Sequence, residues 1–185
     1  MIELKIEHME RLEAALSETP EKIPRAASRA INRAAYTART EAARKVREEY
    51  IIKHGDVINT IKIYPASESD LSATVVSRGS VIPLIKFKVS PKKPQPKRKK
   101  PLTATVKRGE GGPIARAFTA QMRSYGYIGV FQRVGNPRLP IRQLYGPSVP
   151  QMIGSRNVSQ WVEEKAQEKL EERLEHEIIR VLEEF

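Results

Sequence analysis

The segment from residue 91 to residue 101, PKKPQPKRKKP, restricts the fold more than any other part of the sequence. It holds four prolines and six basic residues in eleven positions. Because proline lacks a backbone N–H and fixes φ, such a run cannot form an internal strand or a helix. Its charge also keeps it in water. We therefore predict an exposed, extended, basic loop over residues 91–101.

Short strand patterns lie on both sides of this loop. An apolar run at residues 81–89, interrupted by Pro83, precedes it, and apolar and polar residues alternate again at residues 103–106. The loop is therefore predicted to be an insertion within a sheet and not a boundary between domains. Further strand patterns occur at residues 61–75 and 118–134.

The clearest helix pattern covers residues 23–50. Its apolar residues are mostly alanine and recur every three or four positions. Thr19-Pro20 and Pro24 each offer a start, and the sequence leaves that choice open. We expect the helix to end at His54-Gly55-Asp56, where glycine stands in the usual stop position.

Three arginines follow one another at four-residue spacing along this helix, on a stripe beside the alanines. They are Arg25, Arg29 and Arg33. We interpret them as a solvated helix face.

A second long helix is predicted over residues 157–185. Asn157 and Gln160 have the spacing of a capping box. Nine glutamates occupy the other faces of this helix. The apolar face could pack within its own subunit or against neighbouring subunits, and it is a candidate assembly face through Trp161, Leu174, Ile178, Leu182 and Phe185.

The order of patterns predicts one domain over residues 1–185 of the α+β class. A short strand pattern at residues 2–6 comes first. We expect a mainly antiparallel sheet of five or six strands, with the long alanine-rich helix before most of it and the long C-terminal helix after it.

Positive charge is concentrated in the middle of the chain. Residues 61–150 hold 17 Lys and Arg against three Asp and Glu, whereas residues 1–60 hold 11 against 10 and residues 151–185 hold five against nine. This distribution favours contact with a polyanion or an acidic protein surface, although solubility alone is an open alternative. The candidate contacts with DNA or an acidic partner are Lys92, Lys93, Lys97, Arg98, Lys99 and Lys100.

No pattern of catalytic or metal-binding residues stands out. The chain has no cysteine, which excludes thiolate nucleophiles and cysteine-ligated metals, and its three histidines are isolated from one another. No apolar run approaches the roughly 18–20 residues that a membrane helix needs. We expect a protein that is not an enzyme, uses no cofactor and does not enter a membrane.

Several short segments occur along the chain in an order that is characteristic of one family. They are Ala30-Ile31-Asn32-Arg33-Ala34-Ala35, Val81-Ile82-Pro83-Leu84-Ile85-Lys86 with the basic run after it, Ala117-Phe118, Met122, Gly129, Phe131-Gln132-Arg133, Arg138-Leu139-Pro140-Ile141 and Gly146-Pro147-Ser148-Val149-Pro150. In order and spacing they resemble the minor tail protein Z family of long-tailed phages and prophages, over most of the chain.

This resemblance implies a structural virion protein that acts in tail completion and head–tail joining, at the neck and near the DNA channel. It also implies other neck and tail proteins as partners, a homo-oligomeric ring and assembly in the bacterial host cytoplasm. Contact with genome DNA, without sequence preference, would involve the basic loop. The alternative function is a basic nucleic-acid-binding protein that acts without sequence preference.

Overall fold

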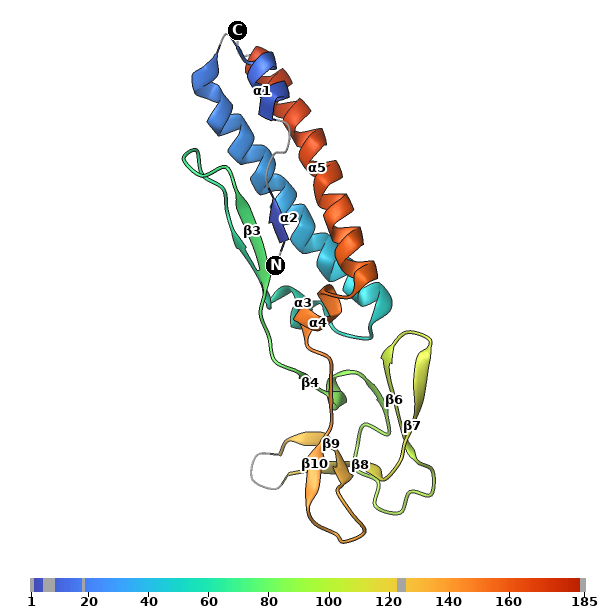
Figure 1. Cartoon of the computed structure of the whole chain (residues 1–185). Coiled ribbons are helices and arrows are strands. Elements are labelled where there is room, and N and C mark those ends of the chain that lie inside the picture. Colours follow the sequence, from blue (N-terminus) through green and yellow to red (C-terminus); the bar gives the residue numbers. More distant parts are fainter. Residues whose placement is uncertain (1, 5–8, 18, 123–125, 184–185) are drawn as a thin grey trace.

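The protein is elongated, with a helical end and a β-rich end (Figure 1). The computed structural model describes residues 2–4, 9–17, 19–122 and 126–183. We call residues 82–147 the β lobe and the remaining described residues the helical lobe. The helices of the helical lobe are α1 (Met9–Ala15), α2 (Ile23–Glu49), α3 (His54–Ile58), α4 (Val149–Ile153) and α5 (Arg156–Glu183).

The two long helices, α2 and α5, run antiparallel and pack along one another (Figure 1). Both were predicted from the sequence, and both are confirmed. The buried side of α2 is mainly alanine, whose short side chain lets a neighbouring backbone approach closely but buries little area. Its buried residues are Ala26, Ala27, Ser28, Ala30, Ile31, Ala34, Ala35, Ala38, Ala42, Ala43 and Val46. On the α2 side the contact therefore depends on its length, whereas α5 contributes larger buried side chains such as Val162 and Leu170.

The start of α2 agrees with a predicted signal, whereas its end does not. Pro20 begins a 3-10 turn (Pro20–Lys22), and the α-helix starts at Ile23 with Pro24 in its first turn. The expected end at His54-Gly55-Asp56 is wrong, because α2 stops at Glu49 and those three residues lie inside α3. Tyr50 is extended and pairs with Lys107 of the β lobe, so a tertiary contact ends the helix before the glycine.

The capping box predicted at Asn157 and Gln160 is also wrong. Helix α5 begins at Arg156, and the carbonyl of Ser155 accepts the N–H groups of Val158 at 3.0 Å and Ser159 at 2.9 Å. A capping box does occur one helix earlier, where the Ser148 and Gln151 side chains bond reciprocally to each other's backbone N–H at the start of α4.

The strands confirm the α+β class and the antiparallel pairing, but not one sheet of five or six strands. Among the described residues they form several small sheets, in the orders β1-β3-β2, β5-β6-β7, β10-β9-β8 and β11-β4. The strands are short, and prolines and glycines between them interrupt any longer ladder. The bounds are β1 (Ile2–Leu4), β2 (Ile61–Tyr64), β3 (Ala73–Ser77), β4 (Ile82–Pro83), β5 (Lys88–Ser90), β6 (Leu102–Lys107), β7 (Glu110–Ile114), β8 (Ala117–Gln121), β9 (Ile128–Arg133), β10 (Ile141–Gln143) and β11 (Tyr145–Gly146).

The β lobe leaves and re-enters the helical lobe through one pair of strands. Ile82 lies opposite Gly146, and Pro83 lies opposite Tyr145. Gly146 is packed against Phe87, since a Cβ atom added there would lie 2.6 Å from the Phe87 ring. The buried core is continuous across this junction, from the alanines of α2 through Phe87 to Val130 in the β lobe.

Candidate functional site

The basic loop of residues 91–101 joins two neighbouring strands of one sheet. Strands β5 and β6 pair directly on either side of it, with Ser90 opposite Thr103. The prediction of an insertion within a sheet is therefore confirmed. The lysines of the loop are all exposed: Lys92, Lys93, Lys97, Lys99 and Lys100.

Arg98 differs from the five lysines, because it holds the loop in place. Its guanidinium is half-buried and donates to the carbonyl of Ala117 over 3.2 Å. The hydroxyl of Thr119 makes a second tie to the loop, donating to the Pro91 carbonyl over 2.7 Å. Both partners belong to β8, so the loop is attached to the neighbouring sheet while its lysines remain available to a partner.

The whole β lobe is basic, beyond the loop itself. Residues 82–147 contain 15 Lys and Arg and a single Asp or Glu, Glu110, whereas the rest of the chain contains 18 basic and 21 acidic residues. The excess positive charge of the protein thus lies entirely at the β-rich end.

Two further arginines of the β lobe were not singled out from the sequence. The guanidinium of Arg133 lies over the Phe118 ring at 5.4 Å and donates to the Arg138 carbonyl over 2.6 Å. Arg142 donates twice to Oε1 of Gln132, at 2.7 and 3.1 Å. Both sit on strands. Arg133 belongs to the family segment Phe131-Gln132-Arg133 without an assigned role, and the shortage of acidic residues in the β lobe is a sequence signal that could have marked both arginines.

Some residues of the candidate assembly face of α5 pack within the subunit, and others are exposed. Trp161, Leu174 and Ile178 are half-buried and pack within the same subunit, against the core clusters. Leu182 is 53% exposed, as is its neighbour Ile179. Phe185 lies outside the described residues.

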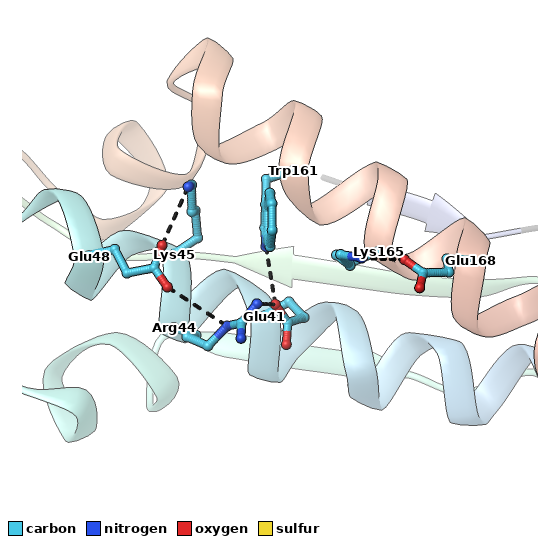
Figure 2. A network of polar contacts seen from close by, with 7 residues as sticks. All are labelled: Glu41, Arg44, Lys45, Glu48, Trp161, Lys165 and Glu168. Carbon is cyan, nitrogen blue, oxygen red and sulfur yellow. Dashed lines mark hydrogen bonds and ion pairs between the residues drawn. The ribbon is translucent and has the colours of Figure 1, made fainter.

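Trp161 stands at the centre of a polar network between α2 and α5 (Figure 2). Its indole Nε1 donates to Oε2 of Glu41 over 3.1 Å. Three cations lie around the ring, with the Lys45 nitrogen 4.6 Å from the ring centroid, Lys165 at 5.5 Å and the Arg44 guanidinium at 5.6 Å. Arg44 is also paired with Glu41 at 2.6 Å. The network stabilises the contact between the two helices.

One glutamate of α5 lies on the buried side of the helix, contrary to the prediction that all nine face elsewhere. Glu177 is only 8% exposed, and its carboxylate lies 3.5 Å from the Arg29 guanidinium. Arg29 is therefore a partner of α5, whereas Arg25 and Arg33 are exposed as predicted. The pair lines a hollow of about 100 Å³ at the end of the two helices, together with Lys22, Arg25, Ala26, Arg180 and Val181.

Neither a metal centre nor a membrane segment is evident in the described part of the chain. In the ranges given above, no three His, Asp or Glu side chains gather closely enough to hold a metal ion. None of the helices in those ranges combines the length and the apolar character required to cross a bilayer.

Comparison with known proteins identifies the class. A family model described as prophage minor tail protein Z (GPZ) matches residues 5–185. The protein is therefore a structural component of a phage tail. Because the match covers nearly the whole chain, the chain belongs to the prophage minor tail protein Z family, as the order of its sequence segments predicted. No curated protein and no solved structure matches the chain.

Proposed function

We propose that this tail protein acts in tail completion and in joining the tail to the head, at the neck and close to the channel through which the genome passes. The charge of the β lobe carries this proposal, with 15 basic residues and one acidic residue in positions 82–147. Genome DNA is the densest negative charge that a neck protein meets. A basic lobe at one end of an elongated molecule suits contact with DNA, and it leaves the helical lobe for protein partners.

The lysines of the basic loop would meet phosphates and not bases. An ammonium group is a point charge on a flexible stem, which suits phosphate oxygens and carries no sequence information. Arg98 keeps the loop against β8 through its bond to Ala117 and thereby positions the lysines. Binding in this proposal is independent of DNA sequence and falls steeply with salt.

The partners in this proposal are other neck and tail proteins and further copies of the same chain. A tail is rotationally symmetric, so a component at its end is expected to form a homo-oligomeric ring. The protein would be made in the bacterial host cytoplasm and would become part of the virion at the neck. It has no catalytic role and no cofactor in this proposal.

Deleting the gene tests the role. Particles made without the protein should fail in tail completion, head joining or genome delivery, and a plasmid copy of the wild-type gene should restore infectivity. A copy with Lys97, Lys99 and Lys100 replaced by glutamine should enter particles but deliver the genome less efficiently. Fully infectious particles from the clean deletion would reject the proposal.

A matched control removes the same charge from the helical lobe. Lys53, Lys62 and Arg78 are exposed and lie outside the β lobe. Replacing these three by glutamine should leave infectivity close to that of the wild type. An equal loss in both variants would point to net charge as the cause, and not to the loop.

A second candidate function is sequence-independent nucleic-acid binding by the free protein. The near absence of acids in the β lobe favours it as well. The two candidates differ in location. Purified virions should contain the protein if it completes the tail, whereas a packaging factor that acts free would stay in the lysate.

A further inference from the structure

The outer side of α2 carries positive charge toward both of its ends, with the uncharged Tyr36 and Thr40 between them. The residues of this side recur every three or four positions, opposite most of the buried alanines. Two of its arginines are also paired within the subunit, Arg29 with Glu177 and Arg44 with Glu41 and Glu48. Arg33 is exposed there and makes no side-chain hydrogen bond or ion pair within the described residues. We call the set the arginine stripe, and its members are Arg25, Arg29, Arg33, Tyr36, Thr40, Arg44 and Arg47.

The outer side of α5 carries the opposite charge. Glu164, Glu168, Glu171 and Glu175 recur at spacings of four, three and four, opposite the buried residues of this helix, and all four are exposed. We call them the glutamate stripe. Glu172 lies beside it, and a hydrogen bond from Lys169 holds the pKa of Glu172 below its ordinary value.

The two stripes lie at matching heights along the pair of helices. Two contacts between α2 and α5 fix the heights, Arg29 with Glu177 at 3.5 Å and Glu41 with Trp161 at 3.1 Å. In an antiparallel pair, each residue forward on α2 corresponds to one residue back on α5. Counting from the two contacts places Arg33 level with residues 169–173, and Glu171 is in the middle of that range.

We infer that a second copy of this chain docks beside the first, with its glutamate stripe on the arginine stripe and its Glu171 against Arg33. The inference rests on the ring in the proposed function and names the surfaces that would form it. The occupant is a second copy because the chain itself supplies both charges.

The matching heights also favour a ring over a filament. Rotating one copy about an axis parallel to its helices, without moving it along that axis, brings the outer side of its α5 against the outer side of α2 on the next copy. Each copy then uses two different surfaces, so the contact repeats around an axis parallel to the helices and closes when the rotation closes.

Charge exchange in the full-length protein tests the contact. Association would be followed by sedimentation velocity over a range of concentrations at low and high salt. Arg33→Glu and Glu171→Arg each place like charges together, so each should raise the dissociation constant about tenfold or more. The double variant should associate as the wild type does. An equimolar mixture of the two single variants should also assemble, since each restores the other's pair.

A control pair changes the same charges outside the stripes. Lys62 and Glu68 are exposed on the helical lobe, so Lys62→Glu and Glu68→Arg should leave association unchanged. The inference is overturned if the wild type stays monomeric at low salt, if the double variant does not recover, or if the control pair weakens association equally. Loss of DNA binding by Arg33→Glu with unchanged association would also overturn it and would assign the stripe to nucleic acid.

Particle assays separate this inference from the proposed function. If the exchanges leave association unchanged while deletion of the gene still blocks tail completion, the interface is wrong and the function stands. If deletion yields infectious particles, the function is wrong whatever the protein does in solution.

Discussion

The indole Nε1 of Trp161 donates a hydrogen bond to Oε2 of Glu41, 120 positions away in the sequence, over 3.1 Å. The bond links α5 to α2 at a point where three cations surround the indole ring. Alanines supply most of the buried side of α2 and make no directional contacts, whereas this hydrogen bond is directional. It therefore fixes how the two helices are aligned.

Replacing Trp161 by phenylalanine should lower the free energy of unfolding by about 1–2 kcal/mol, because an aromatic ring remains but the donor to Glu41 is lost. Urea denaturation would measure the change. Tyr36 is 55% exposed and provides the control, since Tyr36→Phe removes only an exposed hydroxyl. Equal stability of the Trp161 variant and the wild type would show that the hydrogen bond contributes nothing.

Gly146→Ala should destabilise the junction between the lobes by about 1–3 kcal/mol, because the added Cβ would overlap Phe87 and the core there is tightly packed. Phe87 is 1% exposed and has little room to move. Gly55 in α3 has no atom within 4 Å of an added Cβ. Gly55→Ala should therefore be neutral or stabilising by up to about 1 kcal/mol, as expected in a helix. Thermal melts of both variants would check the contrast, and a stable Gly146 variant would contradict the packing argument.

Ala34→Leu should destabilise the protein by about 1–3 kcal/mol, because the larger side chain enters a fully buried helix contact. Ala34 has no exposed surface. The same change at Thr40, which is exposed on the same helix, should leave the melting temperature nearly unchanged. Similar melting temperatures for the two variants would mean that the alanine side tolerates separation of the helices.

Replacing Lys92, Lys93, Lys97, Lys99 and Lys100 by glutamine should weaken binding to random-sequence duplex DNA and flatten its salt dependence. At about 0.9 per phosphate, five contacts would change the slope of log K against log salt by up to about 4.5. Fluorescence anisotropy across a salt series would measure it. Arg98 is left in place, so that its tie to Ala117 keeps the loop attached. An unchanged slope and affinity would remove the loop from DNA binding.

Local sequence patterns predicted the elements that neighbouring residues in the sequence determine. Alanine at helical spacing indicated α2, and the prolines and lysines of residues 91–101 indicated an exposed insertion. Features that depend on distant partners were missed. Helix α2 ends at Glu49 because Tyr50 pairs with Lys107, and Glu177 is buried because Arg29 reaches it from 148 positions away. Likewise, Arg98 had the appearance of another loop cation until the structure placed it against Ala117.

The pairing of β4 with β11 has a consequence for how such a protein can change. Because Ile82 and Gly146 are neighbours, the 63 residues between them form a cassette whose two ends meet at one place. Recombination can exchange such a cassette at this one place, provided that the new cassette still pairs with Tyr50 at the end of α2, as Lys107 does. A phage can thereby alter the charge at one end of the molecule while it keeps the surfaces at the other, and the two ends can diverge at different rates.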